Sequence, residues 1–368
     1  MVSDSIISNK IGFQGMEDLG GGTYSKWRLE SNLDASNGTE GGFYSGSNNF
    51  RIFDRESWIA LGNNNGSLTL GRQYHPAFAA YCNVSATYCM GAGYYNTAVA
   101  LDQGVNTVGK RWDSMYNLTV IATPELTANI ALAQGAAWSS SNVPGNQATP
   151  GNTDSGKGSG FNLIWKPMSN ATVVYANQTA YNSLNTNNLT APTAAAGLAA
   201  AGTANAGPTT VFGNNTGVPN KATTQVFGGS YTMGDYTFRA SQNSQKSDYV
   251  SAAYGNNPKI TNTNLGVKYV TGAYEFNYSY STMKQQSELG AVATSVDGAS
   301  LKSNIAWVQY NLSKTTSAYF VVDKLTKDAL YTGSNANGTA FGGLAAGAGN
   351  GAGSNSITGL TIGMNKKF

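Results

Sequence analysis

The chain has 368 residues, with 22 Lys and Arg against 19 Asp and Glu and a formal net charge of +3 at pH 7. Charged residues make up only 11% of it, against roughly 25% in soluble globular domains, and the near balance of signs excludes a strongly basic nucleic-acid-binding protein. No stretch approaches the ~18 uninterrupted apolar residues of a membrane-spanning helix. Low charge together with 45 Gly and 21 Tyr leaves a large β structure or a disordered polar chain.

Alternation of apolar and polar residues, the mark of a strand with two different faces, recurs along the whole chain. The predicted strands are Ile11–Gln14, Thr23–Leu33, Ser57–Gly62, Ser67–Gln73, Trp112–Ile121, Leu126–Gln134, Phe161–Lys166, Thr172–Gln178, Thr224–Thr232, Tyr236–Ser241, Leu265–Val270, Tyr274–Tyr280, Ile305–Leu312, Ser317–Asp323 and Thr358–Lys366. No segment has the pattern of an amphipathic helix. We therefore expect an all-β, antiparallel protein whose residues 1–368 form a single domain.

The connections between these segments alternate between short turns and long polar loops. The long ones are 34–54, 74–110, 135–159, 180–222, 283–302 and 327–356. Short turns at one end and long loops at the other are typical of transmembrane β-barrels. The segment 180–222 is interpreted as a long extracellular loop and not as a domain linker, because the same strand pattern resumes after it.

The polarity of the two strand faces supports a barrel in lipid. A barrel of fifteen or sixteen strands is too wide for side chains to fill, so its polar face must line water and its apolar face must meet lipid. Aromatic residues near strand ends suit the girdles of such barrels at the membrane interfaces. These residues are Trp112, Tyr116, Trp165, Tyr231, Tyr269 and Phe368.

Three motifs resemble the Gram-negative general porins. Lys10–Gly22 resembles the family's second strand and first turn, Leu68–Gln73 the strand before its inward-folded third loop, and Gly363–Phe368 its terminal strand, with Phe368 as the assembly signal. The resemblance implies an up-and-down β-barrel of 16 strands in the outer membrane. It also implies a homotrimer in contact with the lipid bilayer and lipopolysaccharide, and a passive channel for small hydrophilic solutes and ions that needs no cofactor, metal or nucleic acid.

One departure from the family concerns the strand number. Both ends of such a barrel face the periplasm, so the number is even, whereas fifteen strands are recognisable here. The first short turn follows the first strand, which predicts that an N-terminal strand and a signal peptide are missing from this sequence.

The resemblance also implies where the pore narrows. In the family, the third loop folds into the lumen and faces basic residues on the wall. Carried over, the loop is 74–110, its acid is Asp102, and the basic cluster is Lys10, Arg72 and Arg111. Arg72 shares parity with the apolar face of its strand, so a bulge would be needed to turn it inward. One loop acid against three cations predicts mild anion selectivity.

Other polar residues are further candidates for the lumen wall, namely Lys26, Arg28 and Glu30. Cys82 and Cys89 lie in the same loop, either as a disulfide that stiffens the constriction in an oxidising periplasm or as two unpaired thiols. His75 has no motif around it, and with the cysteines it makes three ligands without a fourth. We therefore predict neither a metal site nor an enzyme.

Two alternative functions stay open. A substrate-specific channel often has an aromatic ladder, which Tyr94 and Tyr95 would suit. A surface adhesin or structural β-protein would explain the Asn, Thr and Gly content, but it would not need polar residues such as Lys268 and Glu275 that alternate with aromatic ones.

Overall fold

The computed structural model describes residues 9–33, 52–87, 89, 111–134, 157–181, 221–248, 259–286, 300–327 and 356–367. They form fifteen strands and the helix α1. In chain order these are β1 (Lys10–Gly20), β2 (Thr23–Asn32), β3 (Glu56–Asn63), β4 (Gly66–Tyr74), α1 (Pro76–Val84), β5 (Arg111–Ile121), β6 (Leu126–Gln134), β7 (Lys157–Met168), β8 (Ala171–Tyr181), β9 (Lys221–Met233), β10 (Tyr236–Asp248), β11 (Lys259–Thr271), β12 (Tyr274–Gln286), β13 (Ser300–Asn311), β14 (Thr316–Lys327) and β15 (Ser356–Lys366). Each predicted strand is therefore confirmed.

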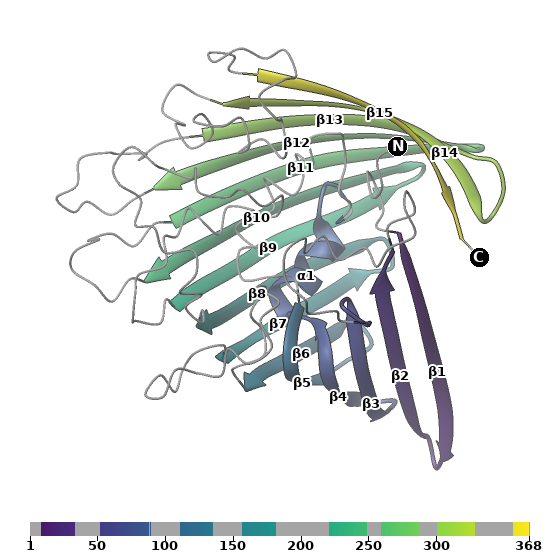
Figure 1. The fold of residues 1–368 in the computed structure, drawn as a ribbon, viewed down its shortest axis with the longest axis vertical. Helices are drawn as coiled ribbons and strands as arrows, with labels where there is room; N and C mark the ends of the chain where they lie inside the picture. The colour runs from purple at the N-terminus through teal and green to yellow at the C-terminus, as the bar shows by residue number, and fades with distance from the viewer. Residues whose placement is uncertain are drawn as a thin grey trace.

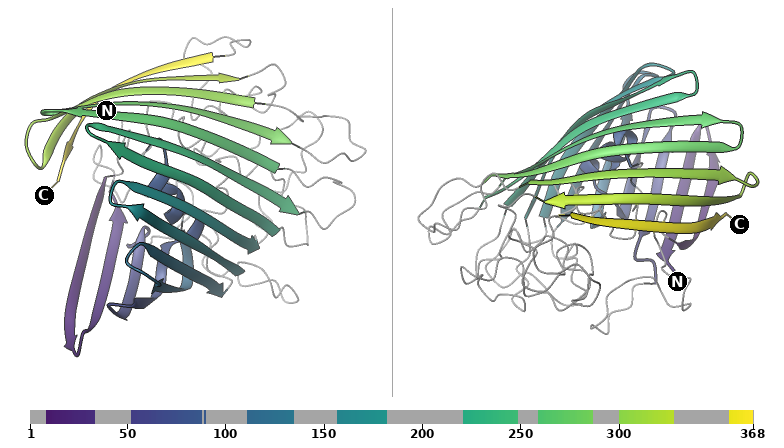
Figure 2. Two further views of the ribbon diagram at one scale, coloured as in Figure 1. Left: turned by 180° about the vertical axis from the view of Figure 1, so that it is seen from behind. Right: turned by 90° about the horizontal axis from the view of Figure 1, so that it is seen from above.

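The strands form one antiparallel sheet in which each strand pairs with the next along the chain (Figure 1). The sheet is strongly curved, and α1 lies on its concave side (Figures 1 and 2). Within the described residues, β1 and β15 are the two edges of the sheet. The predicted up-and-down antiparallel fold is confirmed, and the described part of the chain has no helix long and apolar enough to cross a membrane.

The convex face is apolar and the concave face is polar, the reverse of a soluble sandwich. Phe238, Leu265 and Tyr278 are 44%, 49% and 45% exposed. Their neighbours on the opposite face, such as Asn264 and Ser279, are almost completely buried. Exposed apolar side chains around a polar interior suit a sheet that meets lipid outside and encloses a polar lumen.

Several strands extend farther toward the long loops than the sequence predicted. β10 continues to Asp248, beyond the predicted end at Ser241, and β12 continues to Gln286. In these extensions both faces are polar, so the apolar alternation stops although the ladder of backbone hydrogen bonds continues. The predicted loops 135–159, 180–222, 283–302 and 327–356 are too long at one or both ends for this reason.

Aromatic side chains line the short-turn ends of β10–β13 on the convex face. The rings of Tyr236 and Tyr269 are 4.7 Å apart, and those of Tyr274 and Tyr310 are 4.8 Å apart. They make an aromatic girdle at this end of the sheet. Trp112 was wrongly assigned to a girdle, because it is fully buried on the concave side with its ring 5.3 Å from that of His75. Phe368 lies outside the described residues.

Candidate functional site

Helix α1 is fixed to the concave wall at both ends. Its N-terminus is capped by the Nδ1 of His75, which accepts a hydrogen bond from the backbone N–H of Phe78 at 3.1 Å. The backbone N–H of Ala77 donates to Gln178 of β8 (3.1 Å), and Asn162 of β7 donates to the carbonyl of Pro76 (2.8 Å). Hence the start of the helix is attached to two neighbouring strands. The helix escaped the sequence analysis because it is apolar on several sides and has no amphipathic period.

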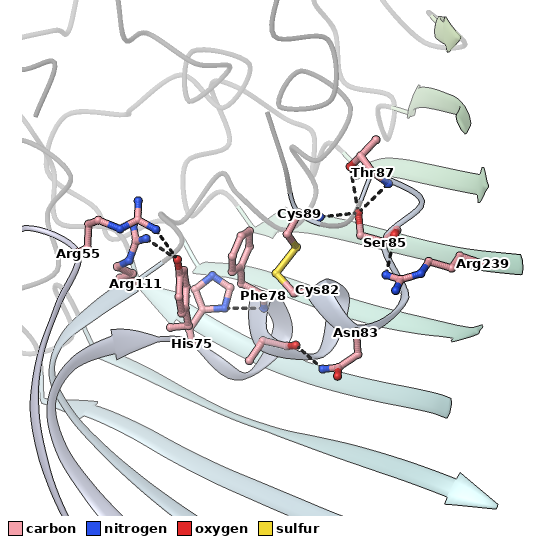
Figure 3. Close-up of a disulfide and its surroundings, with 12 residues drawn as sticks. Arg55, His75, Phe78, Cys82, Asn83, Ser85, Thr87, Cys89, Arg111 and Arg239 are labelled. Atoms are coloured by element: carbon pink, nitrogen blue, oxygen red, sulfur yellow. Dashed lines mark hydrogen bonds between the residues drawn. A yellow bond between two sulfur atoms is a disulfide. The ribbon is translucent and has the colours of Figure 1, made fainter. Parts of the chain in front are cut away.

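The C-terminal end of α1 approaches the wall closely. Arg239 of β10 donates to the carbonyl of Ser85 at 3.3 Å (Figure 3). A Cβ atom at Gly228 would lie 2.7 Å from Val84, and one at Gly266 would lie 2.8 Å from Ala86. Glycine at these two wall positions therefore allows the helix and the residues after it to pack directly against the backbone of the sheet.

A disulfide joins Cys82 to Cys89, with a Cα–Cα distance of 5.1 Å (Figure 3). The hydroxyl oxygen of Ser85 accepts from the backbone N–H groups of Thr87 and Cys89, each at 3.3 Å. These bonds close a compact turn immediately after the helix. The disulfide and the turn restrict the backbone where the chain leaves the wall.

A network of charges covers the concave side of β1–β3 beside this helix. Glu30 accepts from Arg55 at 2.5 Å, forms an ion pair with Lys10 at 3.3 Å, and also accepts from Arg28. Arg28 is paired with Glu56 as well, at 3.2 Å. Burial disfavours the charge on Arg55, but nearby Tyr74 and the carboxylate of Glu30 more than offset it, so the pKa of Arg55 is raised.

Arg72 lies in β4 beside a bulge of the neighbouring strand β5. The register of β4 against β5 shifts between Gly71 and Gln73, and Gly71 has a φ of 120°. The guanidinium of Arg72 donates to the carboxylate of Asp113 at 2.5 Å and to the backbone carbonyl of Asp54 at 2.6 Å. The extra residue of this bulge belongs to β5, between Met115 and Trp112, whereas β4 pairs with β3 through Arg72 without a shift, so an inward turn of Arg72 itself stays a prediction.

Arg111 is held by a phenol, that of Tyr74. Its Nη2 donates to the hydroxyl of Tyr74 at 2.5 Å, and its guanidinium lies 4.3 Å from the centre of that ring. Arg55 donates to the same hydroxyl at 3.1 Å, so two guanidinium groups meet at one oxygen (Figure 3). The Tyr74 ring stacks on Phe78 of α1, with centroids 5.1 Å apart. Tyr74 thus connects the helix to both arginines.

The charges of this cluster nearly cancel. It contains five cations, Lys10, Arg28, Arg55, Arg72 and Arg111, and four carboxylates, Glu30, Asp54, Glu56 and Asp113. Within the described residues, Arg111 is the one cation of the five that forms neither an ion pair nor a hydrogen bond with a carboxylate. Among the described residues of the cluster, an excess of one positive charge therefore remains, and Arg111 is the cation without a carboxylate partner.

The sequence-based candidates are brought together only in part. Lys10, Arg28, Glu30, Arg72 and Arg111 all join the cluster. Lys26 instead lies over the ring of Tyr24, at 4.2 Å. Asp102 lies outside the described residues.

Sequence reasoning missed five members of the cluster, Asp54, Arg55, Glu56, Tyr74 and Asp113. It counted carboxylates only in the loop and so overlooked those that the wall itself supplies. Asp113 carried a usable signal, because it is two residues from Arg111 and hence on the same face of β5. Arg55 and Tyr74 carried none, since both lie where a strand meets a loop.

Comparison with known proteins gives one family and several structural neighbours. A sequence model described as Gram-negative porin matches residues 3–330. No curated protein matches the sequence.

Among solved structures, the chain is similar to an anion-selective porin from Comamonas acidovorans. The TM-score is 0.70 at 18% identity, over 99% of this chain and 90% of that one. OmpT of Vibrio cholerae has a TM-score of 0.57 at 11% identity, over 97% and 91%. OmpF of Salmonella typhi also has 0.57, at 13% identity, over 96% and 89%. At such identities these neighbours establish the fold alone.

Proposed function

The chain belongs to the Gram-negative porin family, and from this premise we propose that its outer-membrane channel is a weakly anion-selective diffusion pore whose preference is set by Arg111. The family and the fold are those of a channel rather than of an enzyme. The observation that carries the proposal is the unequal pairing within the cluster. Four cations pair with carboxylates, whereas among the described residues Arg111 contacts the hydroxyl and the ring of Tyr74 and pairs with no carboxylate.

A single excess charge is enough to bias ions without making a tight binding site. Ion pairs such as Arg72–Asp113 produce fields that cancel within a few Å, while the field of Arg111 extends over about a Debye length, ~10 Å at 0.1 M salt. Anions are therefore concentrated near Arg111 and cations are depleted there. The paired residues act on dipolar solutes only close to the wall, within the few Å over which their fields persist.

The helix and the disulfide support this function by fixing the position of Arg111. Tyr74 is directly followed by His75, the cap of α1, and its ring is stacked on the helix. The Cys82–Cys89 disulfide holds the far end of the same segment. We infer that the loop 74–110 narrows the pore and that its wall-bound part keeps the Arg111 guanidinium in one place.

We also propose that the protein is a homotrimer whose subunits meet at β3, β4 and β6. These strands have 8, 9 and 9 residues, against 13 in each of β9–β12. A strand tilted by about 45° needs roughly 9–11 residues to cross the hydrocarbon, so β3 falls just below this length and β4 and β6 only reach its lower end, while β9–β12 exceed it. Contact with other copies would cover this short side. The structure of OmpT of Vibrio cholerae was described in a trimer form.

Single-channel recording in planar bilayers tests the diffusion pore against the substrate-specific alternative. A diffusion pore should conduct in proportion to KCl concentration up to 1 M, and no single solute should block it saturably. Saturation at low concentration, or block by one solute class, would identify a specific channel instead. Absence of any channel from the folded protein would favour the adhesin.

A further inference from the structure

The first turn of α1 is held by three side chains that differ in their response to acid. Gln178 and Asn162 bond to the backbone of Ala77 and Pro76 through amide groups, which stay uncharged. His75 is the third, and imidazole is the side chain whose ordinary titration falls between about pH 5 and 8. It is also the single histidine of the chain. Mild acid therefore acts on this turn through one of its three side chains.

The cap formed by His75 requires the neutral imidazole. Its Nδ1 accepts a hydrogen bond from the backbone N–H of Phe78 at 3.1 Å, so this nitrogen carries a lone pair and the proton of the neutral ring is on Nε2. An imidazolium has an N–H group at both positions and can only donate. Protonation of Nδ1 and capping of α1 are therefore mutually exclusive.

The surroundings of His75 also disfavour an imidazolium while the cap is in place. The side chain is fully buried, with its ring 5.3 Å from that of Trp112 and 6.1 Å from that of Phe78. It lies at the N-terminus of α1, where the helix dipole is positive and repels a further positive charge. The charged ring therefore has to leave this site, and it does so when the first turn opens to water.

The acidic and basic groups near His75 come from elements other than the helix. α1 and β8, which are bonded to each other at this turn, contain no Asp, Glu, Lys or Arg. The charged and phenolic groups of the described elements around the turn are Tyr74, Tyr81, Arg55, Arg111, Asp113 and Lys157. None of these residue types ordinarily titrates between about pH 5 and 8, so a proton taken up here in that range is assigned to the imidazole.

The capped turn supports the contacts of Arg111 from two sides. Phe78, whose N–H is capped, stacks on Tyr74 with ring centroids 5.1 Å apart, and the hydroxyl of Tyr74 accepts from Arg111 (Figure 3). The ring of His75 itself packs against Trp112, the residue that follows Arg111 in β5. A change at the cap is thus transmitted to Arg111 through Tyr74 and through Trp112.

We propose that His75 is a positioning residue that makes the pore sensitive to mild acid. At neutral pH the uncharged ring caps α1 and keeps Tyr74 against the helix. In acid, a proton from the solution binds Nδ1, the cap is lost and the first turn opens, so that Tyr74 no longer fixes the guanidinium of Arg111. The ion current then fluctuates more. This inference rests on the proposed function, because it takes Arg111 as the group that lies beside the ion path.

The size of the effect follows from the linkage between protonation and capping. A freely exposed imidazole is half protonated near pH 6.5. Where the proton binds only to the uncapped form, the ratio of uncapped to capped α1 rises by up to tenfold for each pH unit below that value. Between about pH 7.5 and about pH 5 the rise is up to about 30-fold. The cap is therefore fully present at neutral pH and is lost as the pH falls.

The first test follows the proton on His75 directly and needs no channel. The whole chain is labelled with nitrogen-15 histidine and refolded in detergent, where its single histidine gives one pair of ring-nitrogen signals. At about pH 7.5 we expect an unprotonated Nδ1 and a protonated Nε2, as the cap requires, with conversion to the imidazolium in acid. A proton on Nδ1 at neutral pH would overturn the proposal whatever the channel does.

The second test records open-channel noise in planar bilayers at about pH 7.5 and about pH 5. It compares the unmodified protein with His75→Asn and His75→Ala. Asparagine caps helices but does not titrate, so the noise of this variant should be the same at both pH values. Alanine cannot cap, so its noise should be about fivefold higher than that of the Asn variant at both pH values. The noise of the unmodified protein alone should rise in acid, by up to about 30-fold.

A matched control separates loosening of the turn from titration. Gln178→Leu removes another bond to the same turn and leaves His75 in place, so its noise should be higher at both pH values and should still rise in acid. A rise of equal size in His75→Asn, or a constant noise level in the unmodified protein, would overturn the proposal. If the His75 variants do not fold, the nitrogen-15 spectrum still decides. An unmodified channel without anion preference would refute the proposed function and leave that spectrum unchanged, so the two failures are distinguishable.

Discussion

Replacing Arg111 by Gln removes the one cluster cation that has no carboxylate partner in the described part of the chain, and we expect this to abolish most of the anion preference. For an ion that passes about 5 Å from the guanidinium, one unit charge in water is worth ~0.8 kcal/mol before screening. In the Gln variant, the energy of an anion at this position rises by this amount and the energy of a cation falls by the same amount. The anion-to-cation permeability ratio therefore changes by twice this energy. Screening reduces each by a factor that depends on the Debye length.

The predicted change therefore depends steeply on salt. The anion-to-cation permeability ratio should fall about tenfold at 0.01 M, about fivefold at 0.1 M and less than twofold at 1 M. The assay is the reversal potential across a planar bilayer under a KCl gradient at each mean concentration. Lys314→Gln, which removes the same charge in the β13–β14 turn, serves as the control. An unchanged reversal potential in dilute salt, or an equal shift at all three concentrations, would refute the placement of Arg111 beside the ion path.

Three further outcomes follow from the same contacts. Asp113→Asn leaves Arg72 without its carboxylate partner, so the permeability ratio should rise toward anions by about fivefold at 0.1 M salt; a fall would show that the pair lies away from the ion path. Tyr74→Phe removes an acceptor shared by two guanidinium groups and should lower the free energy of unfolding in urea by on the order of 1–3 kcal/mol. An unchanged free energy of unfolding would instead show that water replaces the hydroxyl fully. The double variant Cys82→Ser/Cys89→Ser should fold with an unchanged circular dichroism spectrum but show more open-channel noise, because the disulfide restrains the loop and not the sheet. Open-channel noise equal to that of the unmodified protein would argue against that role.

The sheet was predictable because its two faces meet different media. Alternation at Tyr274–Tyr280 identified a strand, and the polar second face, with Glu275 and Asn277, indicated a wet interior. The same signal failed where both faces are polar. Residues 242–248 of β10 and 281–286 of β12 continue as strands through backbone hydrogen bonds alone, and hydrophobic periodicity does not report such bonds.

The charged cluster was predictable to a smaller extent. Parity placed Lys10, Arg28 and Glu30 on the lumen side of their strands. The partners were not predictable, because an ion pair such as Arg72–Asp113 or Arg55–Glu30 joins residues 25 to 41 positions apart. Such pairs depend on which strands are neighbours and on their register. Composition therefore overstated the positive charge of the site, since it counted cations without their partners.

The most direct test of the central claim is the zero-current potential of the unmodified protein in a planar bilayer between 0.01 M and 0.1 M KCl. An excess positive charge at Arg111 predicts a potential whose sign reports chloride as the more permeant ion, and which shrinks toward zero when both solutions are raised toward 1 M, where the Debye length is only ~3 Å. A potential of the opposite sign, reporting potassium as the more permeant ion, would contradict the proposed role of Arg111.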